Sequence, residues 1–332
     1  IVGTGDVENI KQTGAWDDVV GYVEGISEPL RKAIAEYDPN RIALNFSKDN
    51  NIADGLTYGM YLVLQDILGD TPYWSRVVSG EPVASRVRSR KSPEEQRRIR
   101  AAVATTVEIW EELRQWLRPG LTEREIAAFM HERVAARGLT TAWDPRYCPT
   151  VTAGPESPVG HVGPTDIVVE PGHLLSLDFG VRQEEYTSDL QRTFYFLRPG
   201  ETSAPPEVER AFGIISGAIQ AAAEALKPGV QGWEVDQVAR DIFAREGVPP
   251  WEFGLGHQVG RAVHDGGCLL GPRWERYGQR PYDRVEKDQV YTLEIGMTVP
   301  GYGRVNLEED VVVTADGCEF LTPPQREPIL IG

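Results

Sequence analysis

The sequence predicts an α+β protein in which a duplicated C-terminal domain, residues 91–332, follows a smaller α/β domain, residues 1–90. Three observations support this fold class. A helical segment repeats along the chain, a short strand pattern repeats after it, and turn-forming residues separate the two regions. A length of 332 residues fits about two domains, and a hydrophobic fraction of 41% is ordinary for a globular protein with a core.

The N-terminal region alternates short strand-like and helical segments and carries no motif with chemistry. RIALNF (41–46) has the apolar run of a buried strand, and LTYGMYLVLQDIL (56–68) has the spacing of an amphipathic helix. Residues 70–92 are rich in Pro, Gly, Ser and Arg. That composition favours a domain boundary at the end of this stretch.

Capping signals mark two helices at the start of the C-terminal region. Residues 92–95 (SPEE) combine a capping box with Pro at the first helical position, and the helix is expected to run to about Leu117. Residues 122–125 (TERE) form a second capping box. The helix that they open is expected to end at Gly138.

The second helix has a counterpart later in the chain. LRPGLTEREIAAFMHERVAARG (117–138) aligns without gaps to LKPGVQGWEVDQVARDIFAREG (226–247), at an offset of 109 residues. The identical pairs are Leu117/Leu226, Pro119/Pro228, Gly120/Gly229, Glu125/Glu234, Ala135/Ala244 and Gly138/Gly247. The shared Pro-Gly break favours duplication over chance similarity between two amphipathic helices.

A strand pattern also repeats after the helices. HLLSLDFG (173–180) and QVYTLEIG (289–296) are both apolar runs with one acid near the end, then an apolar residue, then Gly. The match puts Asp178 and Glu294 at equivalent positions. Two halves that face each other would bring both acids to one shared centre.

Four acids are expected to point inward from strands: Asp178, Asp189, Glu294 and Glu308. A single such acid could lie at the surface or in a salt bridge. Four of them, at matching positions in two halves, would repel one another when buried without partners. Bound cations would neutralise them, so the pattern predicts a metal centre.

The chain has five histidines, and their surroundings differ. His257 and His264 share GLGHQVGRAVHDGG (254–267), where flanking glycines allow close approach of the backbone to a ligand. His161 lies in the turn-rich SPVGHVGP, His131 is expected on the solvated face of a helix, and His173 is expected in a turn.

One imidazole with four carboxylates forms an oxygen-rich donor set. Structural zinc sites favour Cys and His, so a site of that kind is excluded. The set suits Mn²⁺, with Zn²⁺, Co²⁺ or Fe²⁺ as alternatives. Acids able to bridge would hold two ions about 3.5–4 Å apart and would lower the pKa of a shared water.

In order and spacing these residues resemble the pita-bread metallopeptidases, the family of methionine aminopeptidase, aminopeptidase P, prolidase and creatinase. The resemblance covers about 92–325. Residues 1–90 are more weakly similar to a shortened N-terminal domain of the aminopeptidase P, prolidase and creatinase branch. The matching residues are His161, Asp178, Asp189, His257, His264, Glu294 and Glu308, the last six residues before Thr314.

The resemblance implies a role for each residue. Asp178 would bind one ion, Asp189 and Glu308 would bridge both, and His257 and Glu294 would complete the shells. Glu294 would also serve as general base and acid. His161 and His264 would bind the scissile amide without touching metal. Glu309 is the competing candidate for the bridging carboxylate. Glu308 is preferred because its spacing of six residues from Thr314 fits the family pattern.

Two positions depart from the family pattern. Ile295 follows Glu294 where the family often has Pro, and Asn306 stands two residues before Glu308 where many members have Arg. Arg304 and Arg273 lie nearby and are both candidates for binding a substrate carboxylate. These departures bear on substrate length and leave the metal ligands unaffected.

The resemblance implies a dinuclear peptidase that hydrolyses the bond between an N-terminal residue and proline with a hydroxide that bridges the ions. It would be an Xaa-Pro dipeptidase or aminopeptidase. The alternatives are methionine aminopeptidase, which typically lacks the N-terminal region, creatinase-like chemistry without metal, and a non-catalytic binding protein. The intact ligand set argues against the last two.

The bulk properties bear on partners and compartment. A net charge of −16 argues against nucleic acid, and the basic stretch 86–100 is interpreted as a linker that leads into a solvated helix face. The sequence has no apolar run of membrane-spanning length. Three unpatterned cysteines, Cys148, Cys268 and Cys318, are expected to be inert thiols and favour a cytoplasmic protein. The resemblance implies a homodimer.

Overall fold

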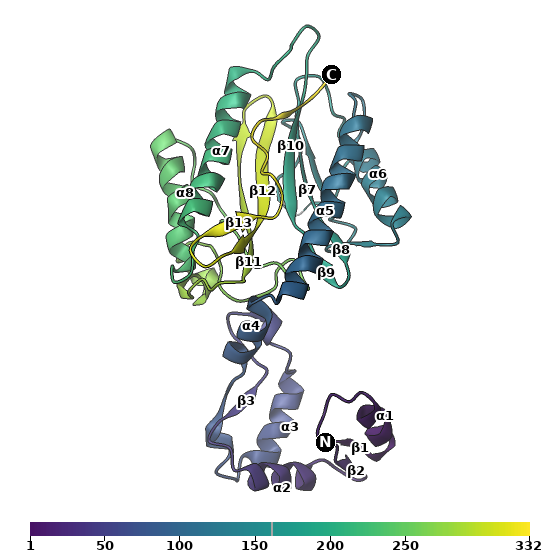
Figure 1. Ribbon diagram of the computed structural model, residues 1–332, viewed down its shortest axis with the longest axis vertical. Coiled ribbons are helices and arrows are strands. Elements are labelled where there is room, and N and C mark those ends of the chain that lie inside the picture. The colour runs from purple at the N-terminus through teal and green to yellow at the C-terminus, as the bar shows by residue number, and fades with distance from the viewer. Residues whose placement is uncertain (161) are drawn as a thin grey trace. The chain divides into compact units, whose positions relative to one another are not determined.

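The computed structural model describes residues 1–160 and 162–332, which form two compact units, Ile1–Ala84 and Ser85–Gly332 (Figure 1). The division falls inside helix α4 (Glu81–Ser89), close to the boundary expected at residue 90. Each unit is described by itself.

The first unit combines short helices with two pairs of parallel strands. The predicted helix is α3 (Tyr58–Leu68), and the Thr57 hydroxyl caps it by accepting a hydrogen bond from the Met60 amide. The predicted strand is β3 (Ile42–Leu44), but the prediction that it is buried is wrong, because it pairs with a single strand and its residues stay partly exposed. The remaining elements are β1 (Val2–Gly3), α1 (Val7–Gln12), β2 (Gly21–Tyr22), α2 (Ser27–Tyr37) and β4 (Val77–Ser79).

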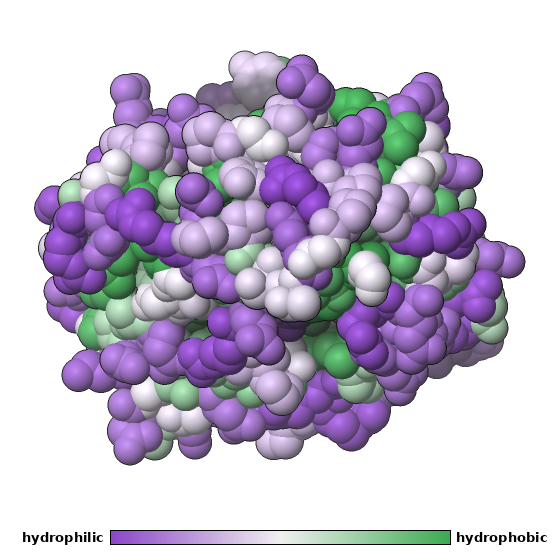
Figure 2. Space-filling view, turned by 90° about the horizontal axis from the view of Figure 1, so that it is seen from above, coloured by the Kyte–Doolittle hydropathy of each residue, from purple (hydrophilic) through white to green (hydrophobic). Residues whose placement is uncertain are grey.

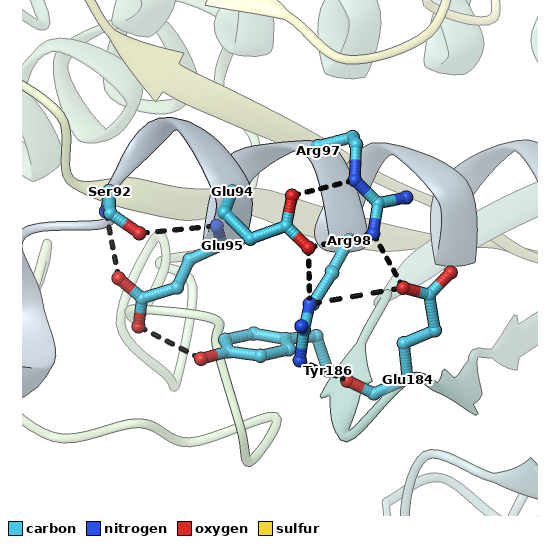
Figure 3. Close-up of polar contacts among 7 residues, drawn as sticks. All are labelled: Ser92, Glu94, Glu95, Arg97, Arg98, Glu184 and Tyr186. Atoms are coloured by element: carbon cyan, nitrogen blue, oxygen red, sulfur yellow. Dashed lines mark hydrogen bonds and ion pairs between the residues drawn. The ribbon is translucent and has the colours of Figure 1, made fainter.

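The second unit places two helix pairs beside one large sheet (Figure 1). Helix α5 (Pro93–Trp116) is followed by α6 (Glu123–Ala136), and α7 (Pro206–Ala225) by α8 (Gly232–Glu246). Both predicted capping boxes are present, at Ser92 and at Thr122. Figure 3 shows the first of them, where the Glu95 carboxylate accepts hydrogen bonds from the Ser92 amide at 2.8 Å and the Tyr186 hydroxyl at 2.9 Å.

The basic stretch at residues 86–100 is largely neutralised by acids of the same unit. Figure 3 shows Arg97 bound to Glu94 at 2.8 Å and to Glu184 at 2.6 Å, with Arg98 bound to Glu94 at 2.9 Å. These pairs are exposed, as expected of a solvated helix face. Lys91 is the exception, because it is buried.

The large sheet has the strand order β11–β12–β10–β7–β6, and each neighbouring pair is antiparallel. Strand β13 extends it at β12 and β14 at β10, while β5, β8 and β9 form a separate small sheet. The bounds are β5 (Thr140–Thr141), β6 (Thr150–Ala153), β7 (Leu174–Phe179), β8 (Val181–Gln183), β9 (Tyr186–Thr187), β10 (Leu190–Phe196), β11 (Val290–Val299), β12 (Gly303–Val313), β13 (Cys318–Phe320) and β14 (Ile329–Ile331).

The predicted duplication is visible in backbone detail at the Pro-Gly breaks. Gly120 and Gly229 have φ values of 93° and 94°. The Gly120 amide donates to the Val169 carbonyl at 2.8 Å, and the Gly229 amide donates to the Val285 carbonyl at 2.9 Å. A capping box opens the following helix in both halves. Each half thus repeats the same turn, the same helix start and the same contact with the segment that leads into β7 or β11.

Each helix pair covers its own part of the sheet with a separate core. One core joins α7 and α8 to β11 and β12, and the other joins α5 and α6 to β6 and β7. The face of the molecule in Figure 2 is mostly hydrophilic, with apolar side chains in small separate groups. Across residues 1–160 and 162–332, no helix combines the length and apolar character that a bilayer crossing needs.

The matched turns predict matched stability effects. Gly120→Ala and Gly229→Ala should each lower the free energy of unfolding by about 1–2 kcal/mol, because an L side chain is strained at positive φ. The space around both glycines is open, so a steric clash adds nothing. Gly213→Ala, in the interior of α7, should instead stabilise by about 0.5–1 kcal/mol. Urea unfolding of the three variants measures these changes in the free energy of unfolding. An unchanged value for either turn variant would contradict the equivalence of the turns at Gly120 and Gly229.

Candidate metal centre

Four side chains from four neighbouring strands form a row across one face of the large sheet. The strand register places Asp178 of β7 opposite Gln191 of β10, Gln191 opposite Glu308 of β12, and Glu308 opposite Glu294 of β11. Directly opposed residues of antiparallel strands point to the same face. The two acids at equivalent positions, Asp178 and Glu294, therefore stand at the two ends of one row.

Asp189 and His257 approach this row from adjoining segments. Asp189 lies two residues before Gln191 and so faces the same side of the sheet. His257 Nε2 lies 3.7 Å from Asp189 Oδ2, 3.8 Å from Glu294 Oε1 and 3.9 Å from Glu308 Oε1. These separations are too long for hydrogen bonds and leave room for a cation among the four groups. Ligand atoms of Asp189, His257 and Glu308 all lie within 4.8 Å of one another.

A glycine allows the segment that carries His257 to lie against β11. A Cβ at Gly256 would come within 2.0 Å of the Thr292 carbonyl oxygen, so any other residue would push this segment away. The Thr292 amide donates to the His257 carbonyl at 2.9 Å, and the His257 amide donates to the Thr292 hydroxyl at 3.2 Å. These hydrogen bonds fix the backbone of His257 against β11.

The acids at the centre lie close together, and several of their oxygen atoms are buried. Asp178 Oδ1, Asp189 Oδ1 and Glu308 Oε1 are buried and accept no hydrogen bond from any residue that the structure describes. Burial raises the pKa of Asp178 to about 7, and burial followed by repulsion from Asp178 raises the pKa of Glu294 to about 8. Burial also raises the pKa of Asp189 well above its usual value, and repulsion from Glu308 adds to this effect. In the same way, burial followed by repulsion from Glu294 raises the pKa of Glu308.

Burial has the opposite effect on the imidazole, whose pKa falls well below its usual value. His257 is therefore neutral near pH 7 and presents the form that binds a metal ion. An oxygen-rich set with one neutral imidazole and unsatisfied carboxylate oxygens fits divalent cations. The assignment of these five residues as ligands stays a prediction.

Glu308 and Glu309 lie on opposite faces of β12. Glu309 forms a buried ion pair with Arg192 at 3.0 Å and accepts a hydrogen bond from the Gln325 amide at 2.9 Å. Glu308 instead points into the acid row. The geometry supports Glu308 as the bridging candidate and gives Glu309 a structural role.

The remaining histidines fall in different surroundings. The His264 ring lies 4.1 Å from the His257 ring, centroid to centroid, and its side chain is exposed. His161 lies outside the described residues. His173 lies at the entry to β7 as expected, where its Nδ1 accepts a hydrogen bond from the Glu170 amide. The expectation of a solvated His131 is wrong, because its Nε2 lies 2.6 Å from the Cys148 carbonyl and the side chain is half-buried.

The three cysteines are free thiols, and Cys148 and Cys268 are buried. Burial raises the pKa of all three, to about 12 for Cys268 and about 11 for Cys318. They are therefore protonated near neutral pH, in agreement with the expectation of inert thiols.

Sequence reasoning missed two polar residues at the centre. Gln191 donates from Nε2 to Glu308 Oε2 at 2.9 Å and to Glu294 Oε2 at 3.3 Å, and so links both halves. Asp310 accepts a hydrogen bond from the Asp189 amide at 3.0 Å. Each lies two residues from a predicted ligand, so the period of a strand could have identified both.

A buried ion pair beside His264 was also missed. Lys91 Nζ donates to Asp265 Oδ2 at 2.8 Å, and both side chains are almost fully buried. Arg88 also binds Asp265, and the Asp265 amide donates to the Gln258 carbonyl. These contacts brace the turn between His257 and His264. The partners are 174 residues apart, and no local pattern connects them.

Two isosteric variants separate the faces of β12. Loss of a residue that only supports a metal ligand costs roughly 10–100-fold in metal affinity. Glu308→Gln removes a ligand itself, so it should reduce metal affinity by more than this, without destabilising the metal-free protein. Glu309→Gln should leave Arg192 buried and unpaired, at a cost of about 3–5 kcal/mol of unfolding free energy, and keep metal affinity. Calorimetric Mn²⁺ titration and urea unfolding give both readouts. Loss of stability in Glu308→Gln together with loss of metal affinity in Glu309→Gln would refute the assignment of Glu308 as the metal ligand.

The raised carboxyl pKa values predict a pH effect on the metal-free protein. From about pH 4 to about pH 8 the folded state holds protons that the unfolded chain has released. The free energy of unfolding therefore falls as pH rises through this window. Bound cations offset the loss, so the increase in Tm on adding Mn²⁺ to chelator-treated protein should be larger near pH 8 than near pH 5. Equal increases would contradict this electrostatic account.

The profile of metallopeptidase family M24 matches residues 97–315. The chain is 30% identical over 211 residues to Xaa-Pro dipeptidase of Pyrococcus horikoshii, which covers 63% of this chain and 56% of that relative. It is 28% identical to Xaa-Pro dipeptidase of Lactobacillus helveticus over 97% of this chain and 82% of that relative. The chain thus spans little more than half of the first relative and most of the second.

A solved structure shares the fold. The X-Pro aminopeptidase of Thermotoga maritima superposes with a TM-score of 0.74 and 26% identity, over 99% of this chain and 85% of that one. The predicted α+β pita-bread fold is confirmed by this similarity. With a profile match over most of the Ser85–Gly332 unit, the chain belongs to metallopeptidase family M24, as its resemblance to the pita-bread metallopeptidases predicted.

Proposed function

We propose that this chain is a peptidase that hydrolyses the bond between an N-terminal residue and a following proline with the help of two divalent cations. The observation that carries the proposal is the convergence of Asp178, Asp189, His257, Glu294 and Glu308, from both halves, on one buried centre. The names of the relatives, Xaa-Pro dipeptidase and X-Pro aminopeptidase, support proline as the second residue.

The residues divide the work of holding the cations. Asp178 and Glu294, at the ends of the row, would each serve mainly one ion, and Asp189 and Glu308 would bridge both. His257 would add its neutral nitrogen. Cations held there would lower the pKa of a water molecule and polarise the scissile carbonyl. Gln191 would keep the two glutamates of the row in position through its hydrogen bonds.

Glu294 is the candidate for proton transfer. Its side chain keeps 24% of its surface exposed, whereas Glu308 keeps 2%, so Glu294 can reach both water and substrate. It would accept the proton of the attacking water and return it to the proline nitrogen, which must be protonated as it departs. His264, beside His257, would hydrogen-bond the scissile amide, and we propose the same role for His161 from its place in the sequence.

The proposal extends to ions, assembly and compartment. Mn²⁺ is the preferred ion on donor chemistry, with Zn²⁺, Co²⁺ and Fe²⁺ as alternatives. A homodimer is proposed from the resemblance to the pita-bread metallopeptidases. A cytoplasmic location is supported by the three free cysteines.

A substrate panel tests the reaction. After Mn²⁺ loading, the enzyme should hydrolyse proline peptides such as Ala-Pro-Ala, and Met-Ala-Ala should be a poor substrate. Asp189→Ala should abolish both Mn²⁺ binding and hydrolysis, because it removes a bridging carboxylate. Release of Ala and Met, measured by chromatography, reports the outcome. Cleavage of Met-Ala-Ala alone would refute the proline specificity, and an active, metal-loaded Asp189→Ala variant would refute the site.

A further inference from the structure

The acid row is the first of three rows that β11 and β12 present on the same face. Two residues along from Glu294 and Glu308, the register pairs Gly296 with Asn306, and two residues further it pairs Thr298 with Arg304. A Cβ at Gly296 would lie 1.8 Å from Asn306 Oδ1, so the glycine makes room for the amide. The only cation among these three rows is Arg304, in the row farthest from the acids.

A pocket of about 240 Å³ lies beside the outer rows. Its lining includes Gly296, Thr298 and Arg304 of these rows, together with Met297. Its walls are the segment from Val248 to Phe253, which follows α8, and Val159. The pocket therefore begins one strand repeat away from Glu294 and has an apolar rim with one guanidinium at its base.

The aromatic wall of the pocket is held firmly. The Trp251 and Phe253 rings meet edge to face at 5.3 Å. Arg240 donates to the carbonyl oxygens of both residues, at 2.7 Å to Trp251 and 2.5 Å to Phe253, and is itself bound to the buried Asp236 at 2.5 Å. A wall braced in this way gives the pocket a fixed width.

Arg304 has donors to spare. One guanidinium nitrogen donates to the Thr298 hydroxyl at 3.0 Å, and Nε is buried without a hydrogen-bond partner in the described residues. The exposed Glu252 carboxylate is the acid on the pocket wall and attracts the Arg304 guanidinium through its charge, but no ion pair among the described residues joins the two. An anion in the pocket would satisfy this half-buried cation.

The other candidate from the sequence is engaged elsewhere. The Arg273 guanidinium lies over the Trp233 ring, 4.2 Å from its centre, and is not part of the pocket. It therefore serves as a matched control for Arg304.

We propose that Arg304 binds the C-terminal carboxylate of a peptide that continues two residues beyond proline, so that tetrapeptides are better substrates than dipeptides. This inference rests on the proposed peptidase function. The reaction sets the direction of the peptide, because the N-terminal residue is cleaved off at the acid row and the rest of the peptide extends toward Arg304, which attracts the carboxylate.

The strand spacing sets the length. Arg304 lies four positions from Glu308, which corresponds to about 13 Å at the rise of a strand. With the scissile carbonyl at the acid row, an extended peptide advances about 3.5 Å per residue beyond it, so the carboxylate of a dipeptide would stop roughly 10 Å short of the outer row. Two further residues bring it to about 3 Å from that row, which is hydrogen-bonding distance. Because Thr298 holds the guanidinium in its own row, Arg304 does not lean back toward the acids.

The test compares peptide acids with their C-terminal amides. The substrates are Ala-Pro, Ala-Pro-Ala and Ala-Pro-Ala-Ala, with Met-Ala-Ala-Ala as a series without proline. The wild-type enzyme is compared with Arg304→Met, Arg304→Lys and Arg273→Met. We expect amidation of Ala-Pro-Ala-Ala to raise the wild-type KM about 10-fold or more, at nearly constant kcat. Arg304→Met should raise the KM of the acid by the same factor, and its KM should be the same for acid and amide. Arg304→Lys should recover part of the preference for the acid over the amide. Arg273→Met should behave as wild type.

The acid and amide comparison on the wild-type enzyme needs no substitution, so poor folding of a variant cannot obscure the result. Equal KM values for acid and amide, or a higher kcat/KM for Ala-Pro than for Ala-Pro-Ala-Ala, would overturn the inference. If Met-Ala-Ala-Ala is cleaved in place of the proline peptides, the proposed proline specificity fails. The comparison of Met-Ala-Ala-Ala with its C-terminal amide then still tests the role of Arg304. If no peptide is cleaved, calorimetric binding of both forms gives the same comparison.

Discussion

Repulsion among buried carboxylates at the centre of the large sheet is the constraint on which the rest of the structure depends. Asp178, Asp189, Glu294 and Glu308 converge with several oxygen atoms buried, and hydrogen bonds from Gln191 reach only two of them. Such an arrangement is costly unless cations neutralise it. The raised pKa values of the acids and the lowered pKa of His257 are two consequences of the same burial.

The duplicated architecture explains how the chain brings these charges together. Matching turns at Gly120 and Gly229 start the second helix of each pair and join it to the segment that leads into β7 or β11. Strands β10 and β12 then join the halves at the centre, so β7 and β11 lie at equal distances from the junction. The strand register alone places Asp178 and Glu294 at opposite ends of one row. The same register, followed outward, leads from the acids to Arg304.

The sequence was a good guide wherever the signal is local or repeated. Capping boxes located α5 and α6, and the strand echo brought Asp178 and Glu294 to one site. It was a poor guide to contacts between distant segments. Nothing near Lys91 reveals that it is buried against Asp265, and the half-buried state of His131 depends on the segment at Cys148. The preference for Glu308 over Glu309 rested on family spacing, whereas strand alternation gives it a physical reason.

One measurement tests the central claim most directly. A crystal structure of the Mn²⁺-loaded protein, with anomalous scattering recorded at the manganese edge, would locate the ions without assumptions about the ligands. The account predicts two peaks about 3.5–4 Å apart, enclosed by Asp178, Asp189, His257, Glu294 and Glu308. A single peak, or peaks bound by other side chains while these acids remain without a cation, would contradict it.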